Sequence, residues 1–351
     1  MAKSVIFLFF IFFFLASSVS GEGTGCGRDL KTDACHDKAK SLKLKLIAIA
    51  AIFVASMVGI CLPIFSRAIP ALRPDKNLFV LVKAFASGVI LATGYMHVMP
   101  DSFNDLTSEC LPETPWRKFP FTTFVAMLSA VVTLMVDSLA LSFYKKRMER
   151  PRVGFKEPEG NRGLTVELQN ADGHCHGHGL GSEKSEDKDS QLLRYRVVAQ
   201  VLELGIVVHS VVIGLSMGSS DNQCTIKPLV AALCFHQLFE GMGLGGCIIQ
   251  GEYGAKMKAI MIFFFAATTP FGIALGIGLS NVYSEDSPTA LKVVGLLNAS
   301  SAGLLNYMAL VDLLASDFMG AKLQANLKLQ MWAYAAVLFG AGFMSLMAKW
   351  A

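Results

Sequence analysis

Long apolar segments separated by short polar ones dominate this chain. A membrane-spanning helix needs about 20 mostly apolar residues, and eight segments meet that requirement. They are roughly Leu44–Ile64, Leu78–Met99, Phe119–Phe143, Val197–Gly218, Ile226–Gln250, Ala259–Leu279, Thr289–Leu314 and Met331–Ala348. Charged residues make up only 17% of the 351 residues, whereas a soluble domain carries about 25%. The pattern therefore predicts an all-α membrane protein with eight transmembrane helices, three in residues 44–144 and five in residues 195–351.

Basic residues are concentrated in alternate loops, which indicates how the spans are oriented. The basic loop residues are Arg67, Arg73, Lys76, Lys145, Lys146, Arg147, Arg150, Arg152, Arg194, Arg196, Lys256, Lys258, Lys322 and Lys328. Such loops normally face the cytosol, so both ends of the mature protein are predicted to be extracellular. Nucleic-acid binding would need a basic face on a folded domain, and the pattern offers none.

The N-terminus has the features of a secretory signal. Lys3 is followed by an apolar core at Val5–Leu15 and then by small residues up to Gly21, which predicts a removed signal peptide over residues 1–20. A first transmembrane anchor is the alternative. Residues 21–43 then form a short extracellular segment.

Four cysteines are predicted on the non-cytosolic side, where disulfides form. We expect Cys26 and Cys35 to pair with each other, since they flank a short polar stretch. Cys110 and Cys224 lie in later loops on the same side and offer a second disulfide.

The loop over residues 145–194 is long, charged and poor in large apolar residues, so it is predicted to be cytosolic and disordered. It contains His174, Cys175, His176 and His178. Imidazole and thiolate groups on a flexible segment chelate zinc or copper, although the spacing is not that of a zinc finger. The loop is interpreted as a metal-sensing or metal-delivering segment; the alternative is a solvated run without a role.

Ionisable residues inside spans are costly and need a reason. His209 lies in the fourth span, and His236 and Glu240 lie four residues apart in the fifth, on one helical face. Both histidines are ten residues from the outer ends of their spans, or roughly 15 Å deep. Two imidazoles and a carboxylate at one depth suit zinc or ferrous iron, whereas magnesium prefers oxygen ligands. The alternative is a polar network that only joins two helices.

Other ionisable residues could mark the ends of an ion path. His97 and Asp101, at the outer end of the second span, could admit cations or form an ordinary interfacial pair. Asp137 and Asp312 lie toward the cytosolic side of spans three and seven. Either acid could line an exit or pair with a base, and Lys83 is predicted to extend to the surface or to pair with one of them.

The strings HSVVIGLSMG, from His209, and HQLFEGMGLG, from His236, resemble the signature of the ZIP metal transporters, in the form of plant zinc- and iron-regulated members. The resemblance implies an inverted repeat of spans one to three and six to eight around spans four and five. It implies metal transport into the cytosol through the site at His209, His236 and Glu240. It also implies that Ser210 and Gln237 border a second, weaker metal site.

One position departs from that family. Many members carry a glutamate where this chain has Ile213, which leaves one carboxylate at the centre.

We therefore predict a plasma-membrane transporter of Zn²⁺, with Fe²⁺, Mn²⁺ and Cd²⁺ also tolerated by this ligand set, and no cofactor. Its expected partners are the metal ions, the lipid bilayer and a second copy of the chain in a homodimer, with no nucleic acid. The alternatives are a non-transporting membrane metal receptor and an intramembrane hydrolase using Ser216 or Glu240. Ser216 lies in a G-x-S-x-G match, but that motif needs a strand-to-helix turn and this one lies in an apolar helix.

Overall fold

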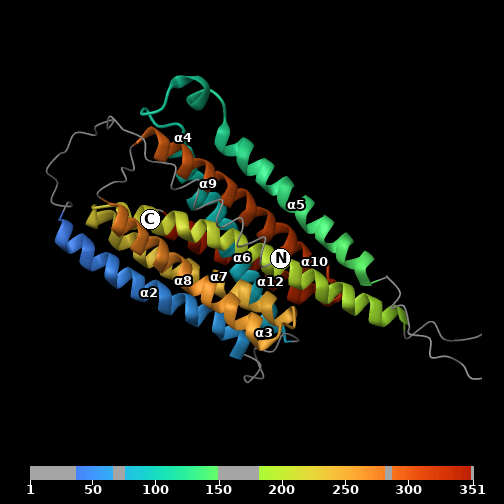
Figure 1. Ribbon diagram of the computed structural model, residues 1–351. Coiled ribbons are helices and arrows are strands. Elements are labelled where there is room, and N and C mark those ends of the chain that lie inside the picture. The colour runs from blue at the N-terminus through green and yellow to red at the C-terminus, as the bar shows by residue number, and fades with distance from the viewer. Residues whose placement is uncertain (1–36, 66–75, 149–181, 281–286, 349–351) are drawn as a thin grey trace, which may run out of the picture.

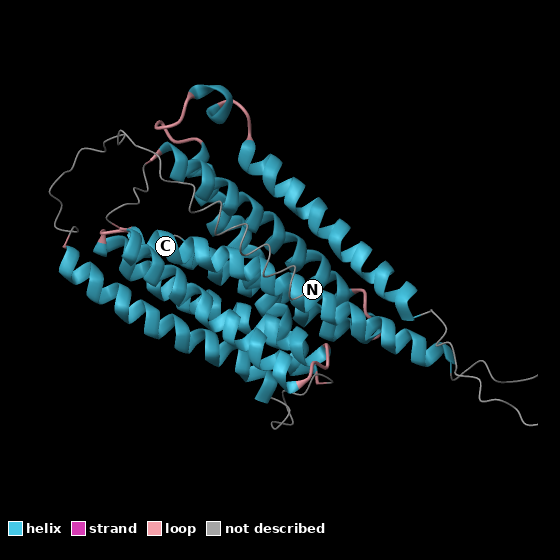
Figure 2. Cartoon of the chain, in the orientation of Figure 1, coloured by secondary structure: helices cyan, strands magenta, loops and turns pink. Residues whose placement is uncertain are grey.

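The computed structural model describes residues 37–65, 76–148, 182–280 and 287–348, and over these ranges the chain forms helices without any strand (Figure 2). The elements, with η for a π-helix, are α2 (Lys38–Phe65), α3 (Asn77–Thr93), η3 (Gly94–Val98), α4 (Met99–Leu106), η4 (Glu113–Arg117), α5 (Phe121–Met148), α6 (Ser182–Ser219), α7 (Gln223–Gln250), α8 (Ala255–Leu279), α9 (Pro288–Tyr307), η5 (Met308–Ala315), α10 (Ser316–Phe318), α11 (Ala321–Gln324) and α12 (Leu327–Ala348).

The predicted number of spans is confirmed within these ranges, since eight helices are long and apolar enough to cross a membrane. Two of the eight pass through a π-helix. The second span runs through η3 from Asn77 to Leu106, and the seventh runs through η5 from Pro288 to Phe318.

The helices extend beyond the apolar segments that predicted them. The largest difference is at α6, because the segment predicted to be disordered up to Arg194 is already helical from Ser182. Hydropathy detects only the apolar part of a helix, whereas backbone hydrogen bonding continues through polar residues and ends at caps. Two helices begin at such caps. Asn222 before α7 accepts a hydrogen bond from the amide of Cys224 at 3.0 Å, and Ser287 before α9 accepts one from the amide of Ala290 at 3.2 Å.

Several predicted features lie outside the described residues. They are the signal segment over residues 1–20, the pair Cys26 and Cys35, and the loop ligands His174, Cys175, His176 and His178.

The helices form two groups (Figure 1). In the α6–α7 bundle, α2 packs along α7, and α6 packs along α8. In the α3–α9 bundle, α3 packs along α12, while α9 packs along α5 and α4. The two bundles meet where α3 contacts α7 and where α6 contacts α9.

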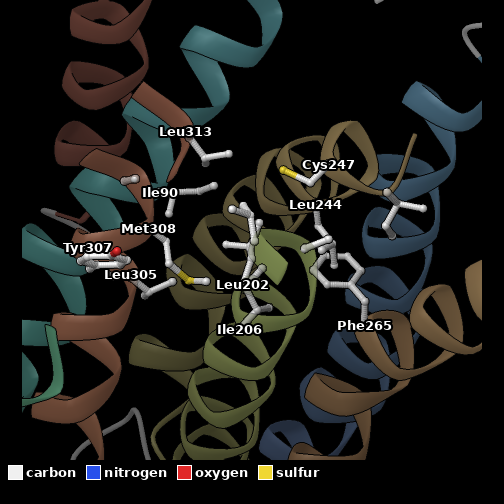
Figure 3. Packing of buried hydrophobic residues seen from close by; sticks show 14 of the residues in the cluster. Ile90, Leu202, Ile206, Leu244, Cys247, Phe265, Leu305, Tyr307, Met308 and Leu313 are labelled. Carbon is white, nitrogen blue, oxygen red and sulfur yellow. The ribbon is translucent and has the colours of Figure 1, made fainter. Parts of the chain in front are cut away.

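The apolar core fills this junction. Figure 3 shows Ile90 of α3 and Met308 of η5 facing Leu202 of α6 and Leu244 of α7, and all four are fully buried. The outermost helices, by contrast, expose their apolar side chains. Large apolar side chains such as Leu139 of α5 are exposed, as expected for a surface that meets lipid rather than water.

Small residues let the helices of the α6–α7 bundle approach closely. A Cβ added at Gly59 of α2 would lie 2.9 Å from the carbonyl carbon of Leu238 in α7. Likewise, a Cβ at Gly272 of α8 would lie 2.9 Å from the carbonyl oxygen of Val211 in α6. Close backbone approach through small residues is typical of membrane helix pairs, and it is what holds α6 and α7 in fixed positions.

Gly59 allows a direct test of this packing. Gly59→Ala should destabilise the protein by roughly 1–3 kcal/mol, the usual cost of overpacking, because the new methyl group meets backbone that cannot move aside. Gly278→Ala is the matched control, since nothing lies within 4 Å of its added Cβ; it should be neutral or slightly stabilising. Thermal unfolding of the two variants in detergent makes the comparison, and equal melting temperatures would contradict the packing argument.

Candidate metal centre

The antiparallel pair α6 and α7 brings three ionisable side chains together. The connection between these helices is short, with Asn222 capping α7, so residues at similar distances from it lie at similar depths. His209, His236 and Glu240 each offer a ligand atom, and these atoms all lie within 4.8 Å of one another. A zinc ion bound at 2.0–2.1 Å places tetrahedral ligands about 3.4 Å apart, so small side-chain rotations would complete such a site.

These three side chains are buried without hydrogen-bond partners. His209 and His236 are each 1% exposed and Glu240 is 0% exposed. No ring nitrogen of either histidine and no carboxylate oxygen of Glu240 has a partner. An unsatisfied buried polar group costs about 1–3 kcal/mol, and a structure that keeps several of them side by side indicates a site shaped for a ligand. Two nitrogens and a carboxylate suit a transition-metal ion.

His97 reaches this centre from the other bundle. Its ring centroid lies 6.2 Å from that of His236 and 6.5 Å from that of His209, while the His209 and His236 centroids are 5.8 Å apart. The interfacial pair of His97 with Asp101, one of the two alternatives left open by the sequence, is loose, with 3.9 Å between Nδ1 of His97 and Oδ2 of Asp101. Asp101 is half-exposed, and His97 lies between this acid and the triad.

The sequence placed His97 too near the surface because the second span is longer than its apolar segment. That segment ended at Met99, whereas the helix continues to Leu106. His97 therefore lies nine residues, or roughly 14 Å, from the Leu106 end of the span. It also lies in η3, and π-helical turns inside α-helices frequently occur at functional sites. The polar segment Asp101–Leu106, which continues the helix, could have indicated from the sequence that the second span is longer.

The two residues predicted to border a second metal site differ in their contacts. Ser210 is buried, and its hydroxyl has no partner. Gln237 donates from Nε2 to Oγ of Ser56 at 3.1 Å, which ties α7 to α2. Ile213 packs in a buried apolar cluster with Leu233, so this turn of α6 adds no ligand to the centre.

The two buried acids predicted on the cytosolic side lie near one tyrosine. Asp137 accepts a hydrogen bond from the hydroxyl of Tyr307 at 3.4 Å, and Asp312 interacts electrostatically with Asp137. One oxygen of each acid is buried without a partner. The prediction that Lys83 reaches the surface or pairs with one of them is wrong: it binds Asp317 at 2.9 Å, an acid that the sequence analysis did not single out.

Comparisons with known proteins cover these same helices. The chain matches the family model described as ZIP Zinc transporter over residues 42–348. A rice protein (Oryza sativa subsp. japonica) named Fe(2+) transport protein 2 is 60% identical over 345 residues, which are 93% of this chain and 90% of that protein. Two Arabidopsis thaliana proteins are also similar. Probable zinc transporter 10 is 55% identical over 100% of both chains, and Fe(2+) transport protein 1 is 54% identical over 98% of this chain and 96% of its own.

The triad can be tested by binding alone. Glu240→Gln keeps the size of the side chain but removes the negative charge, so we expect zinc to bind the purified protein at least about tenfold more weakly, in line with the sensitivity of metal sites to their ligands. Isothermal titration in detergent measures the affinity. The control is Glu113→Gln, at an exposed acid between α4 and α5, and a similar loss in both variants would exclude Glu240 as a ligand.

Proposed function

Since the chain belongs to the ZIP zinc transporter family, we propose that it carries divalent transition-metal ions across a membrane into the cytosol. It is a multi-pass membrane protein and a transporter rather than an enzyme, which removes the hydrolase alternative. The observation that carries the proposal is the buried triad of His209, His236 and Glu240, whose polar atoms lack partners.

We propose that this triad is the transport site. An ion stripped of its water shell cannot cross an apolar interior unless the protein supplies ligands. The triad supplies them near mid-membrane, and His97 faces it from the α3–α9 bundle. A site shared between two bundles can change its exposure when the bundles shift, as transport by alternating access requires.

A path through the protein follows from the same residues. Asp101 attracts the ion at the outer end, and His97 leads from it to the triad. Asp137 and Asp312 lie toward the opposite end and keep unpartnered oxygens, so they are the ligands proposed along the exit. Ser210 and Gln237 border the centre as an auxiliary site.

The ligand set and the relatives agree on the class of substrate. Imidazole with a single carboxylate favours Zn²⁺ and Fe²⁺, and it also tolerates Mn²⁺ and Cd²⁺. Relatives at 54–60% identity are named for Fe²⁺ or for zinc. The metals are the transported substrate, and transport needs no cofactor. We propose zinc as the main substrate.

Two independent features support the proposed orientation. Basic residues gather in alternate loops, and such loops normally face the cytosol. Cys110, in the connection after α4, and Cys224, in the first turn of α7, lie at the other ends of the spans and are each in a disulfide, while Cys61, Cys234 and Cys247 within spans are free. Disulfides persist outside the cytosol. Both mature termini are therefore proposed to be extracellular, in the plasma membrane.

The π-helices support the proposed inverted repeat. Spans two and seven occupy equivalent positions in a repeat of spans one to three and six to eight. Both are interrupted, by η3 and η5 respectively, and each interruption carries an inward ionisable residue, His97 or Asp312.

Uptake into proteoliposomes separates a transporter from a metal receptor, which would bind zinc without moving it. Purified protein in liposomes loaded with a zinc-sensitive dye should produce a saturable signal, and parallel assays with Fe²⁺, Mn²⁺ and Cd²⁺ rank the substrates. Binding in detergent combined with no flux for any of these ions would favour the receptor.

Alanine variants test the transport site. His209→Ala and His236→Ala should each reach the membrane at normal abundance yet reduce zinc uptake to near background, because each removes one ligand from a buried ion. Ser219→Ala is a suitable control, since this serine ends α6 beyond the centre. Near-normal uptake by either histidine variant would remove that residue from the site.

The histidine loop should be dispensable for translocation. Replacing residues 173–179 with glycine and serine of equal length removes its ligands while keeping the connection between spans three and four. We expect the initial rate of zinc uptake to stay within a fewfold of the parent, while metal-dependent turnover or selectivity changes. A variant without uptake at normal surface abundance would place the loop in the path.

A further inference from the structure

Lys83 is buried in α3 and holds three helices together at one end of the protein. Its ammonium group is 2.9 Å from Oδ1 of Asp317 in α10 and 3.4 Å from Oε1 of Gln250 at the end of α7. Its side chain is 5% exposed. A buried ammonium group needs such partners, because removing one of them leaves an uncompensated charge.

These contacts lie on the helices that carry the proposed ion path. Fourteen residues separate Lys83 from His97, and ten separate Gln250 from Glu240, so the cluster lies roughly 15–20 Å from the metal centre. Asp317 follows Asp312 by five residues on the seventh span. By the proposed orientation, the cluster is at the cytosolic end.

The cluster also crosses the boundary between the two bundles. Lys83 and Asp317 belong to helices of the α3–α9 bundle, whereas Gln250 belongs to the α6–α7 bundle. The chain offers a contrast in Lys45, an equally buried lysine that binds Asp221 at 3.6 Å. Lys45 lies in α2 and Asp221 in the α6–α7 connection, so this pair stays within one bundle and cannot respond to a shift between the two.

We propose that Lys83 is a latch that closes the cytosolic end of the ion path, an inference that rests on the proposed transport function. In the closed arrangement the ammonium group neutralises Asp317 and binds Gln250, which holds the end of α7 against α3 and α10. A divalent ion arriving from Asp312 can replace the ammonium group at the Asp317 carboxylate. The hydrogen bond from Lys83 to Gln250 then breaks, and α7 separates from α3 and α10. Lys83 is thus a positioning residue and not a metal ligand.

Cys247 is a natural reporter for this opening. It is a free thiol, 1% exposed, and lies three residues before Gln250. It is also an electrostatic neighbour of Lys83. A membrane-impermeant maleimide applied to inside-out vesicles should label it slowly in the parent without metal. Labelling that disappears with Cys247→Ala identifies its signal.

Single substitutions give the first set of expected results. Lys83→Gln should speed Cys247 labelling at least fivefold, because the latch is lost. Lys83→Arg keeps the charge and should stay near the parent rate. Lys45→Gln is the matched control: it removes a buried lysine that does not join the bundles, so the rate should not change. Equal acceleration by Lys45→Gln would overturn the proposal, since labelling would then report general loosening.

Two further variants separate a latch from simple charge balance. In Lys83→Gln with Asp317→Asn, no buried charge is left unpaired. A latch predicts labelling as fast as in Lys83→Gln alone, whereas a return to the parent rate would show that only charge balance matters and would overturn the proposal. Gln250→Ala removes the hydrogen bond between Lys83 and Gln250 but keeps the Lys83–Asp317 pair, and it should speed labelling at least twofold. This variant tests the latch if Lys83→Gln does not reach the membrane.

Zinc uptake by the parent keeps this inference separate from the proposed function. If the parent takes up zinc but Lys83→Gln and Gln250→Ala leave labelling unchanged, the latch is wrong and the transporter stands. If the parent takes up none of the metals while these variants open Cys247, the transport proposal fails, and with it the role of the latch in transport.

Discussion

The cost of leaving polar groups unpaired in an apolar interior governs this structure. Most buried polar side chains pay that cost locally, as Gln237 does with Ser56 and Lys83 does with Asp317. The histidines and the glutamate of the centre do not, although they are as deeply buried as the core. Their ring nitrogens and carboxylate oxygens lie close together and lack partners, as several other buried polar atoms such as Oγ of Ser210 also do, and we propose that the triad binds an ion.

Close helix packing is what keeps the reserved groups together. The glycines of α2 and α8 allow backbone contact with α7 and α6, so the helices that carry His209, His236 and Glu240 are held within a rigid group. The α3–α9 bundle meets this group over an apolar junction (Figure 3) and contributes His97 from across it. Apolar contact surfaces without many polar bonds can slide, as the proposed alternating access would need.

Polar contacts between the bundles therefore fix their relative position more firmly than the apolar junction does. One such contact is the approach of the His97 ring to the rings of His209 and His236, and another is the hydrogen bond from Lys83 to Gln250. We propose that an ion in the centre would bind side chains of both bundles, and that an ion at the acids beyond it would compete with Lys83 for Asp317, because both contacts are electrostatic.

The sequence by itself determined the eight spans, and it predicted their sides and the three residues of the triad. Segment length and charge are local properties, and the spacing of His236 and Glu240 needs only a helix. Depth matching then brought His209 to them without any knowledge of the packing. The sequence could not place His97, because the polar end of its helix is invisible to hydropathy, and it could not choose Asp317 over Asp137 or Asp312 as the partner of Lys83. Those choices depend on which faces of distant helices meet, and only the tertiary packing of the two bundles decides that.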